Sequence, residues 1–534
     1  MSEELKVARN AGTVGAATLL SRVLGLAREQ VMATLFGAGL ATDAFNVAFR
    51  MPNLLRDLFA EGAMSSAFVP TFTEHLQNRG EEEAWALGRQ LMSTLLAVLA
   101  VVCVIGMVFA PLLVRLFAPG FGAQPGKLEL TTMLTRVMLP FLPAVALAAA
   151  AMGMLNARGR FAVPALAPTL LNLGMVIFGV ALIPACRAVG QRPILAMAIG
   201  VLIGGLMQFG VQIPALAREG FRFRLEWPRR HPGVERVATL MLPATIGLAA
   251  TQVNLLVSTL IASLLEQGSV SWLWYAFRLM QLPIGVFGVA LATVSLPALS
   301  RAAVARDMDA LKSTLSATLR LVFLLTVPAA LWMAVMARPV IALLYEHGHF
   351  HALDTERTAA ALVMYCLGLP AFAAVGVLTR TFYALGETRV PVQSSFVAVA
   401  INLALNLLFI GPLKPLGLGH LGLALATSVT SILNMGQLAF YLRRRVGLLE
   451  GRRMARTLAK VGLSSAIAAA ACGGALLWLG GRWHRGFVFE GLTVAGALVL
   501  ALVVGYGAMK ALRVEELGAL ESLTSSLSAK LRGR

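Results

Sequence analysis

Four arginines lie inside otherwise apolar stretches that are long enough to span a membrane: Arg22, Arg28, Arg56 and Arg278. A cation in the hydrocarbon of a bilayer costs several kcal/mol, so such side chains face a protein interior or a water-filled cavity. The planar guanidinium group pairs best with phosphate and carboxylate oxygens, because its fork of donors matches their geometry. If these arginines converge, they make a cationic chamber suited to an anionic, phosphate-bearing cargo.

Each arginine also has a structural interpretation. Arg28 could snorkel to the interface or pair with a nearby carboxylate, and Arg278 could cap carbonyl groups of a neighbouring helix. Arg22 and Arg28 are six residues apart and point in different directions on a straight helix. A bend near Gly25 would be needed to bring them together. No acid lies within four residues of Arg278, so a local ion pair does not explain it.

A second polar pattern follows in residues 43–57. Asp43, Arg50 and Asp57 are spaced by seven residues, which places them on one helix face and predicts an ion-pair ladder. Arg50 is therefore as easily structural as functional. Arg56 has no obvious helical partner except Asn53, which makes it the better candidate for a cavity.

The composition is that of a membrane protein. Hydrophobic residues make up 58% of the 534 residues and charged residues 13%, with a mean hydropathy of +0.77, whereas soluble domains carry about 25% charged residues. Apolar runs of about 20 residues can each span a bilayer as a helix. We therefore predict an all-α polytopic protein with about fourteen spans, at 11–35, 43–72, 91–117, 130–155, 163–184, 194–217, 236–264, 271–298, 314–345, 357–384, 391–412, 420–442, 456–480 and 487–511.

The net charge of +19 could indicate nucleic acid, but the positions of the charges argue against that partner. Most lysines and arginines fall on one side of the predicted spans, which is the positive-inside bias. It predicts that both termini are cytoplasmic. The strongly basic stretch 218–236 then forms a cytoplasmic connection, and contact with anionic lipid is a secondary effect of the charge. Glu3 and Glu4 stand where a cleavable signal would be basic, so the first segment is predicted to stay as a helix.

The chain repeats itself at an offset of about 227 residues. Leu142-Pro143-Ala144 recurs as Leu369-Pro370-Ala371, and Ala48-Phe49-Arg50 recurs as Ala276-Phe277-Arg278. The repeat predicts a six-helix lobe in residues 1–225, a second in residues 226–445, and two further helices with a cytoplasmic tail in residues 446–534. Because six is even, the lobes are parallel repeats facing a central cleft, a geometry typical of alternating access.

Signals for a metal or for catalysis are weak. The four cysteines are scattered without metal-ligand spacing, and neither a phosphate loop nor a membrane-transferase constellation is present. The sequence thus predicts a carrier driven by a gradient or by voltage, not an enzyme. Asn402 and Asn406 share a helix face and, with Asn254 or Thr427, could form an oxygen site for a cation. Hydrogen bonding between helices is the better interpretation of these side chains.

Ten short motifs resemble the MurJ (MviN) lipid II flippase family, and the close resemblance covers residues 10–445. They are SRVLGLAR at 21–28, FGAG at 36–39, ATDAF at 41–45, PNLLR at 52–56, FAEGA at 59–63, AFVP at 67–70, PALAPTLLN at 164–172, GSVSW at 268–272, GVFGVAL at 285–291 and FIGPLK at 409–414.

The resemblance implies a fold of the multidrug/oligosaccharidyl-lipid/polysaccharide exporter type, in which the last two helices border a lipid-accessible groove. It implies transport of undecaprenyl-diphosphate-linked peptidoglycan precursor (lipid II) from the inner to the outer leaflet of the bacterial cytoplasmic membrane, with other cell-wall synthesis proteins as possible partners. By position, the resemblance makes Arg22, Arg28, Arg56 and Arg278 the cavity arginines, Asp43 an important acid and Ser21 a cavity residue.

This chain departs from the family pattern at two places. The resemblance implies acids at the two positions that flank Arg278, but this chain has Phe277 and Gln281 there. The family's sodium site implies Asn254, Asn402, Asn406 and Thr427 as loose candidates here, without a carboxylate. Two other functions stay open at this point. An exporter of cationic drugs would need acidic or aromatic cavity walls, and a scaffold that binds anionic lipid would tolerate the loss of single arginines.

Overall fold

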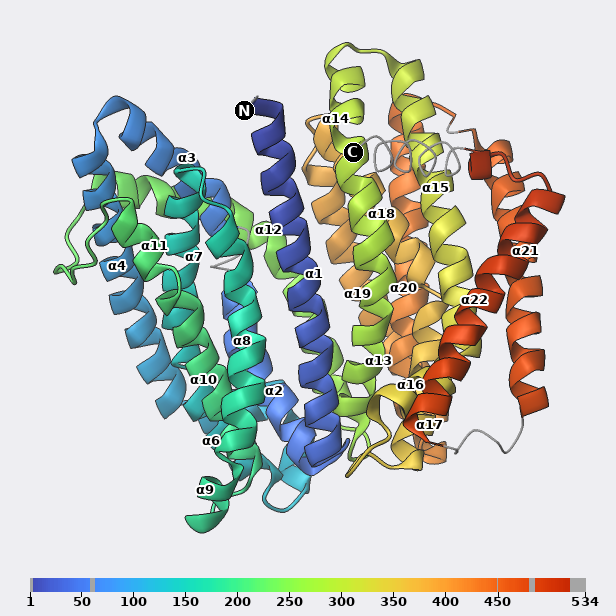
Figure 1. Ribbon diagram of the computed structural model, residues 1–534, viewed down its shortest axis with the longest axis horizontal. Coiled ribbons are helices and arrows are strands. Elements are labelled where there is room, and N and C mark those ends of the chain that lie inside the picture. The colour runs from blue at the N-terminus through green and yellow to red at the C-terminus, as the bar shows by residue number, and fades with distance from the viewer. Residues whose placement is uncertain (1–2, 58–62, 449, 480–485, 519–534) are drawn as a thin grey trace. The chain divides into compact units, whose positions relative to one another are not determined.

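The computed structural model describes residues 3–57, 63–448, 450–479 and 486–518 (Figure 1). In these residues the chain is helical and contains no β-strand. It divides into two compact units, residues 1–271 and 272–534, each with its own packed interior. The boundary falls in the first turn of helix α13 (Ser269–Pro283).

The first unit contains long helices that run alongside one another, with short helices at their ends (Figure 1). In chain order they are α1 (Glu3–Phe36), α2 (Leu40–Arg56), α3 (Ala63–Asn78), α4 (Glu81–Val108), α5 (Ala110–Phe117), the 3₁₀ turn η2 (Pro119–Ala123), α6 (Lys127–Met138), α7 (Phe141–Ala157), α8 (Ala162–Ala181), α9 (Ile183–Ala188), α10 (Ile194–Gly210), α11 (Ile213–Arg218) and α12 (Pro232–Ser263).

The second unit begins with α13 and ends with two long helices near the C-terminus. After α13 come η3 (Ile284–Gly288), α14 (Val289–Val304), α15 (Met308–Val335), α16 (Ala337–Tyr345), α17 (Ala352–Cys366), α18 (Leu369–Ala384), α19 (Arg389–Leu413), η4 (Lys414–Leu416), α20 (Gly419–Val446), α21 (Gly451–Leu479) and α22 (Phe487–Ala511). The η3 segment is a π-helix directly after Pro283, where the missing N–H disturbs the regular ladder.

In the described residues the predicted spans coincide with helices or with runs of consecutive helices, so the predicted all-helical fold class is confirmed; residues 58–62 of span 43–72 and residue 480 of span 456–480 lie outside the described residues. Among the described residues, ten helices are long and apolar enough to cross a membrane, or eleven if the bent pair α17–α18 counts as one span. The protein is therefore a multi-pass membrane protein. The break between α6 and α7 and the break between α17 and α18 fall at matching positions of the repeat, 139–140 and 367–368.

The helices of the first unit pack through an apolar core and through glycine. The core includes Phe68, Phe72 and Phe141, all fully buried. Helices α8 and α10 approach so closely that a Cβ atom on Gly174 would lie 2.4 Å from the Cα atom of Gly204. Small residues permit such backbone contact between membrane helices, where lipid provides no hydrophobic drive for association. This contact fixes the position of α8, which carries Asn172, a hydrogen-bond partner of Arg28.

In the second unit, a buried arginine holds the C-terminal helices in place. Arg320 on α15 lies 2.7 Å from Glu516, just after α22, and 3.1 Å from Glu450, just before α21. A buried cation of this kind requires paired acids, because the desolvation cost is otherwise not offset. The two ion pairs therefore anchor the ends of α21 and α22 against α15.

Candidate functional site

Arg22 is the most accessible of the four arginines. It lies on the exposed face of α1, and no ion pair or hydrogen bond from the described part of the chain reaches its guanidinium group. Ser21, beside it, is half-buried, and its carbonyl oxygen accepts a hydrogen bond of 3.2 Å from the Asn172 amide on α8. An arginine that is open within a membrane-spanning helix needs water or an anion as its partner.

Arg28 differs from Arg22 because it is buried against α8. Its guanidinium group donates to the Asn172 side-chain oxygen at 3.1 Å, contacts the sulfur of Met175, and is ion-paired with the adjacent Glu29. The exposed fraction of Arg28 is only 5%. α1 continues through Gly25 as one uninterrupted helix, and the exposed Arg22 and the buried Arg28 occupy different faces of it, so the structure does not bring the two arginines together.

Arg56, at the end of α2, is connected to α12 by hydrogen bonds through Asp57. Its Nε and Nη2 atoms donate to the Asp57 carboxylate at 3.2 and 2.8 Å. The other Asp57 oxygen accepts from the Gln252 side chain at 3.3 Å. Both ion-paired side chains keep about a quarter or less of their surface exposed, 20% for Arg56 and 26% for Asp57. The expectation that Arg56 lacks a helical partner is wrong, since Asp57 is that partner.

Asp43 lies at the centre of a buried polar cluster. One carboxylate oxygen accepts from Lys127 Nζ at 2.9 Å and from the backbone N–H of Gly268 at 2.8 Å. The other accepts from the backbone N–H of Ser271 at 2.9 Å and from its hydroxyl at 2.7 Å. A carboxylate with one cation and three further donors is well satisfied in a low-dielectric interior. Asp43 therefore ties α2 and α6 to the start of α13.

The predicted ladder of Asp43, Arg50 and Asp57 is wrong. Asp43 pairs with Lys127 and Asp57 pairs with Arg56, while Arg50 donates to the carbonyl oxygen of Leu255 at 3.4 Å. Helical spacing identifies residues that share a face, but Asp43 and Arg50 have partners on other helices and Asp57 pairs with the adjacent Arg56. The observed partners of these charged side chains therefore differ from those that the spacing predicts.

Arg278 belongs to the second unit. Its guanidinium group lies 5.8 Å from the centre of the Trp274 ring and donates to the Gln281 side-chain oxygen at 3.4 Å. Phe277, beside it, packs edge-on against Tyr365. Phe277 thus makes an aromatic contact, and Gln281 supplies Arg278 with a neutral acceptor.

The structure places the predicted residues in separate local environments. Within the first unit, Arg22 is open, Arg28 contacts α8 and Arg56 contacts Asp57, which is hydrogen-bonded to α12, so no direct contact joins them. Since Arg278 belongs to the other unit, the convergence of all four in one chamber stays a prediction.

Sequence reasoning missed three residues that hold the candidate site. They are Asn172, which the sequence analysis includes only as the end of the motif at 164–172, and Lys127 and Gln252, which it does not single out. Each lies far along the chain from its partner, so spacing within one helix carries no signal for these contacts.

The asparagines proposed for a cation form a seam between α19 and α20. Asn406 donates to the Asn402 oxygen at 2.9 Å, and Asn402 donates to the Thr430 hydroxyl at 3.3 Å. Thr427 donates to its own helix at Leu423, and Asn254 belongs to the other unit. Asn406 Oδ1 is buried without a hydrogen-bond partner, but the seam supplies no carboxylate. The seam therefore offers neutral oxygens alone, and a sodium site there stays a prediction.

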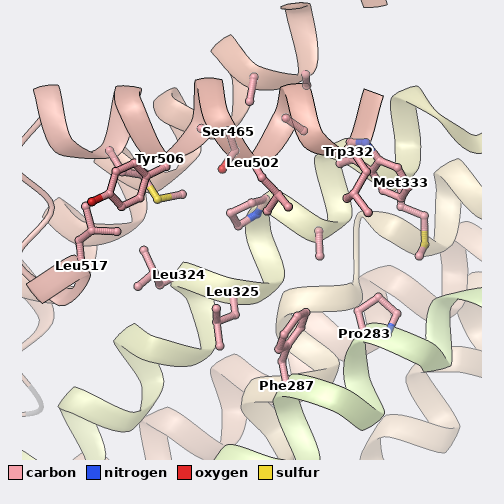
Figure 2. Close-up of a pocket in the computed structure, with 18 residues that line it drawn as sticks. Pro283, Phe287, Leu324, Leu325, Trp332, Met333, Ser465, Leu502, Tyr506 and Leu517 are labelled. Atoms are coloured by element: carbon pink, nitrogen blue, oxygen red, sulfur yellow. The ribbon is translucent and has the colours of Figure 1, made fainter. Parts of the chain in front are cut away.

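An apolar pocket of about 370 Å³ lies in the second unit (Figure 2). Its walls come from η3, α15, α21 and α22, and they include Phe287, Leu324, Trp332, Leu502 and Tyr506. The lining is almost entirely hydrocarbon and aromatic, so the pocket suits an apolar chain and not a charged group. Residues of α21 and α22 form part of its wall, and the lipid-accessible groove at these helices stays a prediction.

Comparison with known proteins supplies the family. The family model described as lipid II flippase MurJ matches residues 32–495. A lipid II flippase MurJ of Burkholderia cenocepacia is 40% identical over 437 residues, covering 81% of this chain and 83% of the relative. A probable lipid II flippase MurJ of Vibrio cholerae is 38% identical over 472 residues, covering 87% of each chain.

Solved structures agree with this result. A lipid II flippase MurJ in an inward closed conformation matches with a TM-score of 0.75 and 26% identity, over 93% of this chain and 99% of its own. An inward-facing multidrug resistance MATE family transporter of the MOP superfamily matches with a TM-score of 0.65 and 15% identity, over 83% of this chain and 99% of its own, which shows a shared fold alone. Given the family model and the long alignments with its members, this chain belongs to the MurJ family of lipid II flippases.

Proposed function

We propose that this chain moves lipid II, the undecaprenyl-diphosphate-linked peptidoglycan precursor, from the inner to the outer leaflet of the bacterial cytoplasmic membrane. The proposal includes alternating access between the two lobes, cytoplasmic termini, and transport without covalent chemistry by the chain itself. The observation that carries it is Arg22, an exposed cation within the largely apolar run 11–27 of α1, which no hydrogen bond or ion pair from the described residues reaches. A diphosphate in a wet chamber satisfies such a group, and hydrocarbon does not.

The other site residues have graded roles in this proposal. Arg22 meets the diphosphate first, because it is exposed and no described residue pairs with it, and Arg278 also contacts the diphosphate. Arg28 and Arg56 join when the diphosphate displaces Glu29 and Asp57, since phosphate oxygens compete well for a guanidinium fork. Ser21 lines the same chamber.

Asp43 contributes differently in the conformation described here. Four donors occupy its carboxylate, so it fixes the start of α13 and touches cargo only if those bonds break.

The apolar tail of the cargo needs a separate place. We propose that the pocket beside α15, α21 and α22 holds part of the polyprenyl chain, because its walls are apolar and it adjoins the last two helices. Trp332 and Tyr506 lie on opposite sides of this pocket in Figure 2. We also propose that voltage or a gradient of an ion other than sodium drives the cycle, so that no sodium site is needed, and that other cell-wall synthesis proteins are partners.

The direct test is leaflet-resolved labelling of lipid II in cells depleted of their own flippase and carrying this chain. We expect the intact chain to restore labelling at the outer leaflet and to restore growth and cell shape. Arg22→Ala and Arg278→Ala should abolish both while the protein stays in the membrane, and Arg22→Lys should impair them because a point charge loses the bidentate grip. Arg301→Ala, at the exposed end of α14, is the matched control and should leave transport intact.

The outcomes separate the rival functions. Normal growth of the Arg22→Ala and Arg278→Ala cells would support a lipid-binding scaffold, and resistance to cationic dyes on expression would support a drug exporter. Replacing external sodium by potassium should leave labelling unchanged; a complete loss would contradict the proposal that no sodium site is needed.

A further inference from the structure

The segment between α11 and α12, residues 221–231, is a structured surface and not a loose linker. It has no helical turn, yet α4 fixes its backbone at several points. The Glu226 backbone N–H donates to the Ser93 hydroxyl at 3.0 Å, and the Gln90 side chain donates to the carbonyl oxygens of Trp227 and Arg229, each at 3.2 Å. Three hydrogen bonds to one helix therefore set the position of this segment.

Side chains strengthen the attachment at the start and in the middle of the segment. Arg89 donates to the Glu226 carboxylate at 2.7 Å. Phe221 is buried, with its ring centre 5.5 Å from that of Trp85 on α4. Neither contact uses the residues that point outward, so the outward surface can be altered without removing the attachment.

The outward surface alternates between basic and apolar side chains. Phe223, Leu225 and Trp227 have exposed fractions of 40%, 68% and 83%. The four arginines of the segment are also exposed: Arg222, Arg224, Arg229 and Arg230. The positive-inside rule explains the arginines of a cytoplasmic segment, but it does not explain the exposed tryptophan and leucine between them. Exposed arginine next to tryptophan is the chemistry of a lipid headgroup interface.

The position of the segment along α4 matches that interface. Its contacts fall at Arg89, Gln90 and Ser93, whereas the large exposed apolar side chains of α4 begin at Val98. Five helical residues span about 7.5 Å along the axis. The headgroup layer on each side of the hydrocarbon is roughly 5–8 Å thick. The segment therefore lies one headgroup layer away from the lipid-facing stripe of α4.

We propose that residues 221–231 dock on anionic lipid headgroups, with Leu225 and Trp227 in the interface and the four arginines paired with phosphates. Phosphatidylglycerol is the simplest lipid of this class. Each arginine near an anionic surface is worth roughly fivefold in binding. The docked segment would hold the end of α12 nearest to it at a fixed depth. This inference does not depend on lipid II as the cargo, because it concerns bulk membrane lipid and a different surface.

The test uses the whole chain in vesicles of phosphatidylcholine with or without phosphatidylglycerol. All four native cysteines are buried, so Leu225→Cys gives a selectively accessible site for an environment-sensitive dye. We expect a blue shift, protection from aqueous iodide and quenching by headgroup-labelled lipid, all stronger with phosphatidylglycerol and weakened by high salt. Equal emission in both lipid mixtures, or full access to iodide in both, overturns the proposal; the second result would indicate a soluble partner or none.

Two variant sets make the result specific. Replacing the four segment arginines by glutamine should remove the dependence on phosphatidylglycerol, with an unchanged thermal transition as evidence of folding. A matched set of exposed arginines in the second unit, Arg443, Arg444, Arg452 and Arg456, replaced in the same way, should leave the dye response unchanged. If the second set abolishes the response and the first does not, net charge and not the segment is responsible, and the proposal fails.

Discussion

The ammonium group of Lys127 lies 2.9 Å from the carboxylate of Asp43, and each side chain has only about 1% of its surface exposed. Lys127 begins α6 and Asp43 lies in the first turn of α2, so the pair joins two helices through a charge contact in the interior. The Phe121 ring, 4.2 Å from Lys127 Nζ, adds a cation–π contact on another side. Two ions buried so deeply stabilise the fold only as a pair.

Removal of Lys127 alone should therefore be costly. Lys127→Met leaves the Asp43 carboxylate buried without its cation, and we expect a loss of about 3–5 kcal/mol in the free energy of unfolding. Adding Asp43→Asn should recover part of this loss, so the double variant is more stable than the sum of the single effects. The stability of each variant is measured by thermal unfolding in detergent. A thiol-reactive dye reports unfolding, because the four cysteines are buried in the folded protein. Breaking the surface pair Lys312–Asp309 is the control, expected to cost about 0–1 kcal/mol; equal costs at both sites would contradict the prediction.

A methyl group at Gly174 should force α8 away from α10. The new Cβ atom would lie 2.4 Å from the Gly204 Cα atom, and backbone cannot yield as a flexible side chain does. We expect Gly174→Ala to destabilise the protein by about 1–3 kcal/mol and to impair transport, since α8 carries the Asn172 contacts to Arg28 and Ser21. Gly210→Ala, with no atom within 4 Å of its Cβ position, should be neutral or slightly stabilising in the same thermal assay.

Neutralising Asp57 should free the charge of Arg56. Asp57→Asn keeps the shape and an acceptor for Arg56 but removes the competing carboxylate. We expect a short-chain polyprenyl diphosphate to bind roughly fivefold more tightly, in line with about 1 kcal/mol for a partly exposed ion pair. Isothermal titration in detergent measures the affinity, with Asp309→Asn at a 97% exposed carboxylate as the control. Weaker binding, as Arg56→Ala should give, would instead mean that Asp57 is needed to position Arg56.

Stability should depend on Glu219 in acid. Glu219 receives hydrogen bonds from Arg160 at 2.7 Å and Arg158 at 3.2 Å, and these donors hold the pKa of its carboxyl below the ordinary 4.5. A lowered carboxyl pKa contributes stability above the unfolded value, and this contribution is lost as the pH falls through the folded value. Glu219→Gln should therefore flatten the decline of the thermal midpoint below pH 4.5. The exposed Glu82→Gln should retain the decline, and identical curves for both variants would refute the assignment.

The sequence alone predicts the features of this protein that depend on residues close together in the chain. The fourteen spans, the fold class and the family followed from apolar runs and contiguous motifs, because the hydrocarbon thickness sets the length of an apolar helix wherever it lies in the chain. The sequence also identifies Arg22 as a candidate site residue, because a cation within an apolar run has a high free-energy cost in the bilayer whatever its neighbours are.

Tertiary structure decided the partners. Asp43 binds Lys127, 84 positions away, and not Arg50; Arg28 binds Asn172, 144 positions away. Charge pairing falls off steeply with distance and depends on burial, so it is set by which helices pack together. Packing in turn depended on close backbone approaches such as that of Gly174 and Gly204, which no single helix reveals.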